Sequence, residues 1–225
     1  RQQCELEGAN EHQVEESQKA VAKMEVIIGD PDRLRAVAED FIKHYETRVA
    51  EGATVAGKAM FVCSNRNIAY DFYKIVKELR PEWTEKKICD DGVVLSEKDK
   101  KELKPMEKIK LVMTRNKDDE KDLFDMLGTK EDRKEFDRQF KNPKSNFKIA
   151  IVVDMWLTGF DVPELDTIYI DKPIQQHTLI QTISRVNRVC EGKDKGLIVD
   201  YIGIKKNMNT ALKKYTNFEL SLIHI

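Results

Sequence analysis

The sequence predicts an α/β fold in which a parallel β-sheet is covered by helices on both faces. Short apolar runs indicate strands buried on both faces, and strands that alternate with helices imply a parallel sheet. Hydrophobic residues make up 40% of the 225 residues and charged residues 35%, which supports a large core under a charged surface. The runs that predict strands are residues 59–63, 109–113, 149–153, 167–170 and 196–199.

Residues 1–52 are expected to form a helical connector or appendage in front of the main domain, which spans residues 53–204. Asp30 followed by Pro31 predicts a helix start, because the first residue can cap the helix and the second fits its first position. Residues 205–225 are expected to form a C-terminal helix that leads out of the domain. Apolar residues recur at helical spacing after the predicted start, at Leu34, Val37, Ala38, Phe41, Ile42 and Tyr45.

Within the main domain, Ser64 is expected to cap the helix that follows the first strand. The lysine-rich residues 82–108 are expected to be an insertion that contains a short strand at residues 93–95. Further helices are expected near residues 119–127 and 130–141 and, with a strongly amphipathic pattern, at about 176–188.

Composition excludes some classes of protein. The net charge of -1 does not by itself indicate a nucleic-acid-binding protein, although a local patch could bind one. No apolar run reaches the length of a membrane span, and no signal peptide is evident. Because the chain begins at Arg1, we expect a fragment of a longer protein. Scattered cysteines without a C-x-x-C pair indicate reduced thiols in a cytoplasmic protein and no metal site, at Cys4, Cys63, Cys89 and Cys190.

One short segment has the spacing of a phosphate-binding loop, G-x-x-x-x-G-K, at Gly52, Gly57 and Lys58. Such a loop joins a strand to a following helix, whose N-terminus points at the phosphates. Here a helix precedes the glycines and a strand follows, and Ala59 replaces the hydroxyl residue that binds magnesium. We therefore interpret the segment as a flexible loop, with Lys58 solvated at the start of the first strand.

The segment "TGFDVP" follows the strand at residues 149–153 and is expected at the carboxyl edge of the sheet, where ligands gather in such folds. Gly159 would let the backbone approach a ligand closely, and Asp161 could accept hydrogen bonds from a ribose. Thr158 could donate one to a backbone phosphate. An ordinary loop, with the Asp capping the next turn, fits the spacing equally well.

In "IQTISRVNRV", Gln181, Arg185 and Arg188 fall on one face of the predicted helix. Two guanidinium groups held by a rigid helix suit the oxygens of a phosphoryl group in transfer, where charge develops in the transition state. Arginines at this spacing more often form salt bridges to a neighbouring element, and that alternative stays open.

These segments resemble a known family. "TGFDVP" followed by "QTISRVNR" resembles motifs V and VI of superfamily 2 helicases and translocases. The longer segments "VVDMWLTGFDVPELDTIYIDKP", "LIQTISRVNRV" and "GLIVDYIGI" resemble the motor (R) subunit of type I restriction enzymes. "GKAMFVCSNRNIAYDFY" resembles motif IV of the same subunit, so the resemblance runs in order through about residues 57–204.

The resemblance implies a second RecA-like lobe that completes an ATP cleft. Arg185 and Arg188 would face the γ-phosphate, with Arg188 as the expected arginine finger, and Gln181 would couple the cleft to DNA. Gly159 and Asp161 would border the ribose and phosphates. Family members contact the DNA backbone with residues that follow strands, which here are Ser64, Arg66, Thr114 and Thr158.

The resemblance also implies the cofactors and partners. ATP and Mg²⁺ would be bound mainly by a first RecA-like lobe of the same chain. The partners would be double-stranded DNA and the methyltransferase and specificity subunits of a restriction complex, with no membrane. The whole subunit would be an ATP-dependent deoxyribonuclease, and this fragment alone would be inactive. Two alternatives are the second lobe of another superfamily 2 DNA-repair or RNA helicase, and a non-catalytic α/β module that binds proteins.

Overall fold

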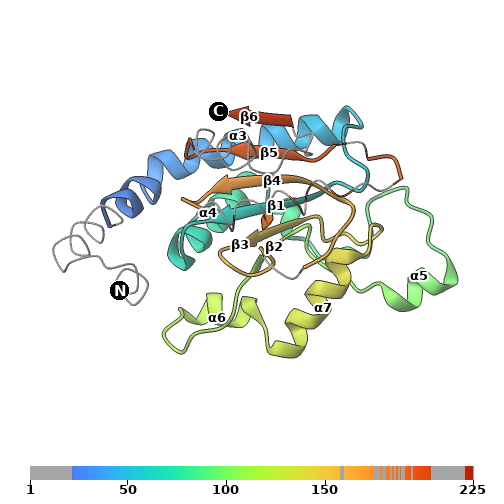
Figure 1. The fold of residues 1–225 in the computed structure, drawn as a ribbon. Coiled ribbons are helices and arrows are strands. Elements are labelled where there is room, and N and C mark those ends of the chain that lie inside the picture. The colour runs from blue at the N-terminus through green and yellow to red at the C-terminus, as the bar shows by residue number, and fades with distance from the viewer. Residues whose placement is uncertain are drawn as a thin grey trace.

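The computed structural model describes residues 22–157, 160–174, 178, 181, 182, 184, 186, 188, 191–193 and 195–203, and the backbone of residues 221–224. Within this part of the chain, parallel strands form one sheet in the order β2-β3-β1-β4-β5-β6 (Figure 1). All five predicted strands are confirmed, and the sixth was not predicted. The strands are β1 (Lys58–Cys63), β2 (Ile109–Val112), β3 (Ile149–Val152), β4 (Leu165–Asp171), β5 (Leu197–Asp200) and β6 (Ser221–His224).

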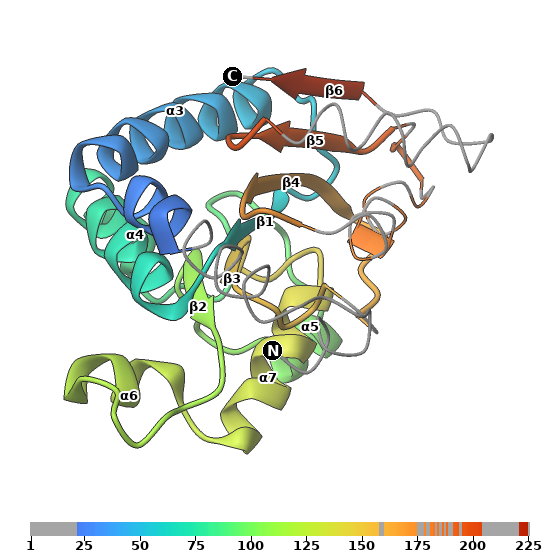
Figure 2. The ribbon, with the colours of Figure 1, turned by 60° about the vertical axis from the view of Figure 1, so that its left-hand side comes forward.

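Helices α3 (Pro31–Ala50) and α4 (Arg66–Leu79) lie side by side on one face of the sheet (Figure 2). Phe41 of α3 is fully buried and meets two rings of the sheet edge-on. Its ring centroid lies 5.2 Å from that of Phe61 and 4.7 Å from that of Tyr169. Full burial of a phenylalanine side chain contributes about 2 to 3 kcal/mol. Helix α3 therefore shares the core of the sheet instead of forming a separate one within the described residues.

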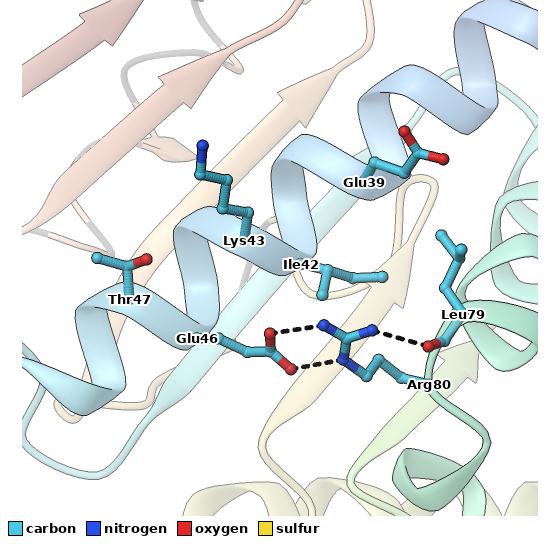
Figure 3. A pocket seen from close by; sticks show the side chains of 7 residues that line it. All are labelled: Glu39, Ile42, Lys43, Glu46, Thr47, Leu79 and Arg80. Atoms are coloured by element: carbon cyan, nitrogen blue, oxygen red, sulfur yellow. Dashed lines mark hydrogen bonds and ion pairs between the residues drawn. The ribbon is translucent and has the colours of Figure 1, made fainter.

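Both ends of α3 are fixed by polar contacts. The predicted N-cap is confirmed, because the carboxylate of Asp30 accepts the backbone N–H of Arg33 at 3.0 Å. Nearer the other end, Glu46 accepts two hydrogen bonds from Arg80, at 2.7 and 2.8 Å. This ion pair spans a hollow of about 330 Å³ between α3 and the end of α4 (Figure 3). Hydrogen bonding to Arg80 lowers the pKa of Glu46 from its usual value.

The other face of the sheet is covered by α7 (Lys130–Lys141) and by the segment that precedes β5. Buried Met60 and Val62 of β1 belong to the core on this face, whereas their neighbours along the strand belong to the opposite core. Helix α6 (Lys121–Leu127) and α7 confirm the two charged helices expected here. The predicted amphipathic helix at about 176–188 is helical at the described residues 178, 181, 182, 184 and 186, but residue 188, at its expected end, is not helical.

Three local predictions are wrong. Residues 93–95 form no strand, and Val94 is 86% exposed, because no neighbouring strand offers the valines a partner. The insertion instead contains a 3₁₀ turn, η1 (Pro81–Thr84), and a short helix, α5 (Glu97–Glu102). The cap of α4 is Asn65, whose side chain accepts the N–H of Ile68, and not Ser64. Residues 221–224, near the end of the helix expected at residues 205–225, form β6 instead, where they pair with β5. Residues 205–220 lie outside the described residues.

Candidate functional site

Arg188 and Asp161 are brought together from the two segments that carry the predicted nucleotide contacts. Nη1 of Arg188 donates to Oδ2 of Asp161 at 2.5 Å, and each side chain is about half exposed, at 50% and 51%. Gln181 is half-buried and helical, whereas Arg188 is not helical, so the predicted shared helix face of these two residues stays a prediction. Arg188 thus forms a salt bridge to a neighbouring segment, which was the alternative interpretation of its position. Its partner, Asp161, is accessible to solvent.

The position of Asp161 differs from the sequence expectation. Leu165 begins β4 beside Lys58, at the amino end of β1. Asp161 lies four residues before Leu165, so the described part of the loop leads to the amino end of β4 and not to the carboxyl edge. The loop crosses the sheet because two parallel strands cannot be joined by a turn at one edge.

An aromatic cluster, formed by Trp156, Phe160 and Phe140, packs the loop between β3 and β4 against α7. Trp156 and Phe160 stack with centroids 4.1 Å apart and planes 2° apart, and both pack near Phe140 of α7. Trp156 has a φ of 66°, the one positive φ among the described residues other than glycine. Such a backbone is strained for a bulky residue and persists only when its surroundings enforce it. This aromatic cluster therefore holds the backbone at Asp161 in place, because Asp161 directly follows Phe160.

Three predicted site residues, Thr158, Gly159 and Arg185, lie outside the described residues. Their proposed contacts with nucleotide and DNA stay predictions.

The described residues that were predicted to contact DNA follow β1 and β2 and lie in two places at the carboxyl edge. Arg66 and exposed Thr114 border a hollow of about 190 Å³, together with Asn116 and Asp154. Ser64 turns toward β4 instead, where its hydroxyl donates to the backbone oxygen of Asp171 at 2.9 Å. The structure thus brings Arg66 and Thr114 together and places Ser64 apart from them.

The guanidinium of Arg66 already has protein partners. It donates to the carbonyl oxygen of Thr114 at 2.6 Å and to both carboxylate oxygens of Asp119, each at 2.6 Å. A phosphate would have to displace Asp119, whose side chain is only 6% exposed. The loop after β2 is thereby fixed to the first turn of α4.

The sequence interpretation missed Lys172, which directly follows β4. Its ammonium group donates to the carbonyl oxygen of Val153 at 3.0 Å and to Asp154 at 2.5 Å. It also missed the pair of buried Asp171 and partly buried Arg33, which are 138 residues apart. The position of "IDKP" directly after a strand was the available signal, but nothing local in the sequence indicates Arg33 as the partner.

The loop with the G-x-x-x-x-G-K spacing is filled by the protein's own carboxylate. Oδ2 of Asp166 accepts the N–H of Val55 at 3.1 Å, and Asp166 also accepts from the backbone of Ala56. Burial raises the pKa of Asp166. Lys58 is only 1% exposed, so the expectation of a solvated side chain is wrong. Its ammonium donates to the carbonyl oxygen of Phe147, and burial lowers its pKa well below the usual value.

The described residues contain no group of three or more His, Cys, Asp or Glu side chains arranged to hold a metal ion. Among the helices that the structure describes, none is long and apolar enough to cross a membrane.

Comparison with known proteins connects these features to a family. A family model described as type I restriction enzyme subunit R domain 3 matches residues 55–203. The chain is 37% identical over 206 residues to the type I restriction enzyme HindI endonuclease subunit of Haemophilus influenzae. It is 39% identical over 211 residues to a Methanocaldococcus jannaschii protein assigned as the type I restriction enzyme MjaIXP endonuclease subunit. The alignments cover 90% and 93% of this chain but 18% of each relative.

A solved fragment assigned to an HsdR subunit of a type I restriction enzyme from Vibrio vulnificus has a similar fold. The TM-score is 0.52 at 14% sequence identity, over 87% of this chain and 33% of that one. This likeness and the parallel sheet confirm the RecA-like α/β fold class. The chain spans about a fifth of the length of its curated relatives, and its matched residues 55–203 show that it belongs to the family of type I restriction enzyme subunit R domain 3.

Proposed function

We propose that this chain is the second RecA-like motor lobe of an ATP-dependent double-stranded-DNA translocase, the R subunit of a type I restriction–modification system. Membership of the R-subunit family supports this proposal. A first RecA-like lobe of the same subunit would bind ATP, and the two lobes would close around it. The subunit would act in the cytoplasm with methyltransferase and specificity subunits.

The observation that carries the proposal is the half-exposed guanidinium of Arg188, held by Asp161. A guanidinium can exchange a carboxylate for a phosphate, because both present paired oxygens to its planar N–H groups. Asp161 would orient Arg188 before the lobes close. On closure, Arg188 would donate to the γ-phosphate oxygens and stabilise the charge that develops on them during transfer to water.

The residues present do not fit a Mg²⁺ site, since the described part of the chain has no cluster of suitable ligands. Mg²⁺ would neutralise charge on the β- and γ-phosphates, and we assign its ligands to the first lobe. The contribution of this chain is the positioning of guanidinium groups and of the DNA-contacting edge.

We assign the DNA contact to the carboxyl edge of the sheet. Polar side chains follow three strands there: Ser64 after β1, Thr114 after β2 and Lys172 after β4. Hydroxyl and ammonium groups are typical donors to backbone phosphates, which fix the position of a protein on DNA without reading its sequence.

The central test is Arg188→Ala in the full-length subunit. Removing an arginine finger lowers turnover by about 10³-fold or more, so ATP turnover should fall by that order while ATP binding is largely retained. Arg138→Ala is a matched control, because Arg138 is also 50% exposed and also paired with an acid, Glu135 on α7. The control should leave turnover unchanged. Near-normal ATP turnover in Arg188→Ala would contradict the proposed role of Arg188 as an arginine finger.

A further inference from the structure

The order of the strands defines a crevice between β1 and β4. These neighbours are paired through Cys63 and Asp171 at their carboxyl ends. The chain leaves β1 through α4 on one face and leaves β4 through a helical segment, containing Val186, on the other face. In open α/β sheets, ligands bind where the connections of adjacent strands diverge in this way.

In this protein, an arginine from α3 occupies the crevice. Nη1 of Arg33 donates to Oδ2 of Asp171 at 3.1 Å, and Nη2 donates to Oδ1 at 2.5 Å. The same guanidinium donates to the carbonyl oxygens of Ile28 at 3.0 Å and Tyr201 at 3.4 Å. The carboxylate of Asp171 is fully buried, and the side chain of Arg33 is 24% exposed. Four acceptors therefore surround one cation at the position where such folds hold a ligand.

The turn before α3 is shaped for this close approach. A Cβ atom at Gly29 would lie 3.1 Å from the carbonyl oxygen of Glu25 and 3.3 Å from the side chain of Ile68 on α4. Glycine avoids both contacts, so the segment that leads into α3 lies tightly against α4. This contact places Arg33 over the ends of β1 and β4.

Asp171 connects this cation to the edge proposed to contact DNA. Its backbone oxygen accepts the hydroxyl of Ser64, which follows β1. The next residue, Lys172, donates to the carbonyl oxygen of Val153 after β3. A shift of Asp171 would therefore move polar groups at the ends of three adjacent strands.

We infer that Arg33 is a positioning residue for DNA binding: it closes the crevice between β1 and β4 and, through Asp171, holds Ser64 and Lys172 in place. This inference rests on the proposed function of the carboxyl edge. The guanidinium of Arg33 fills this crevice, so we expect no nucleotide to bind there. Arg33 acts through Asp171 and does not touch the DNA itself.

The test uses the DNA-stimulated ATPase activity of the full-length subunit in its complex. Arg33→Ala should raise the DNA concentration for half-maximal stimulation by about tenfold, because the edge loses its fixed geometry. The ATP concentration for half-maximal rate should stay within about twofold, since we propose the ATP contacts at Arg188 and not in this crevice. Arg33→Lys keeps the charge but loses the two-point contact, so its DNA half-saturation should be intermediate.

Arg35→Ala is the matched control. Arg35 lies two residues further along α3 and pairs with exposed Glu78 and Glu39 on the surface. It faces away from the crevice contacts, so its removal should leave both half-saturation concentrations unchanged.

Chemical rescue separates positioning from a general loss of structure. Millimolar methylguanidinium should occupy the space vacated in Arg33→Ala and lower its DNA half-saturation toward the wild-type value. It should not help Arg33→Lys, whose side chain still fills the crevice. Potassium chloride at equal concentration is the reference, because added salt alone weakens DNA binding.

The inference is overturned if Arg33→Ala has wild-type DNA half-saturation. It is also overturned if methylguanidinium restores the melting temperature without restoring DNA half-saturation. If Arg33→Ala does not fold, Arg33→Lys decides the question, and a wild-type value in that variant overturns the inference. Failure of the proposed function is distinguishable, because DNA would then not stimulate the wild-type ATPase at all.

Discussion

Arg66 and Asp119 join the start of α4 to the loop after β2 through a single nitrogen, Nη2 of Arg66, which lies 2.6 Å from both carboxylate oxygens. The other terminal nitrogen of Arg66 donates to Thr114, and Asp119 also accepts the N–H of Asn116 at 2.7 Å. Thr114 and Asn116 of the loop after β2 are therefore both hydrogen-bonded to the pair of Arg66 and Asp119. This geometry favours a structural role for Arg66 over the direct DNA contact that the sequence suggested.

Arg66→Ala and Asp119→Ala should each destabilise the 225-residue chain by about 2 kcal/mol, because each leaves a largely buried charged partner without its hydrogen bonds. The double variant should lose much less than the sum, since the two residues act as one unit. Urea denaturation of all four proteins measures this coupling. Additive losses, with only Arg66→Ala reducing the salt dependence of DNA binding, would instead favour a direct phosphate contact.

The strands could be predicted because their signal is local. Five apolar runs, such as the run around Phe61 on β1, marked strands buried on both faces, and Asp30 before Pro31 marked the start of α3 correctly. The valines around Val94 gave the same local signal but have no neighbouring strand, so they stay exposed. Strand formation depends on a partner that a short sequence window does not contain.

The candidate site could be predicted only in part, for the same reason. The sequence indicated Asp161 and Arg188 separately, and the fold brought them into contact. The partners of Arg33 and Arg66 lie 138 and 53 residues away in the chain and leave no pattern at either end. Lys58 was misjudged because a lysine after a glycine-rich loop is usually exposed, whereas β1 lies in the middle of the sheet.

Lys58→Met should leave the affinity of the full-length subunit for ATP unchanged, although Lys58 occupies the lysine position of an ATP-binding loop. Its ammonium group is buried against the carbonyl oxygen of Phe147 and lies 5.1 Å from the centroid of the Phe140 ring, so it cannot reach a phosphate. Methionine has a similar volume and keeps the packing. Equilibrium binding of a fluorescent ATP analogue measures the affinity, and a large loss in this variant would restore the ATP-loop interpretation.

Gly57→Ala should destabilise the chain more than Gly52→Ala. Both glycines have a φ of 66°, where a residue with a Cβ costs about 1 to 2 kcal/mol. A Cβ at Gly57 would also lie 3.3 Å from the hydroxyl of Tyr45, which donates to the carbonyl oxygen of Gly57 at 2.8 Å. A Cβ at Gly52 meets nothing within 4 Å, so this variant measures the backbone strain alone. Equal losses in urea denaturation would contradict a specific contact at Gly57.

His44 should make the chain less stable in mild acid. Nδ1 of His44 lies 2.8 Å from the hydroxyl of Tyr169, and burial, with the nearby charge of Arg48, lowers the pKa of His44 below 6.5. As the pH falls through 6.5, the unfolded chain therefore takes up a proton before the folded chain does, and the free energy of unfolding decreases. Above 6.5 both states are neutral at this residue and the contribution is constant.

His44→Asn isolates this effect, because the amide oxygen of Asn can still accept the hydroxyl of Tyr169 but does not titrate. Urea denaturation of both proteins at pH 7.5 and pH 5.0 gives the comparison. The wild-type chain should lose more stability than His44→Asn between the two conditions, since losses from all other groups are common to both. A parallel loss in the two proteins would show that His44 keeps the same pKa on unfolding, and that its contact with Tyr169 does not depend on the neutral imidazole.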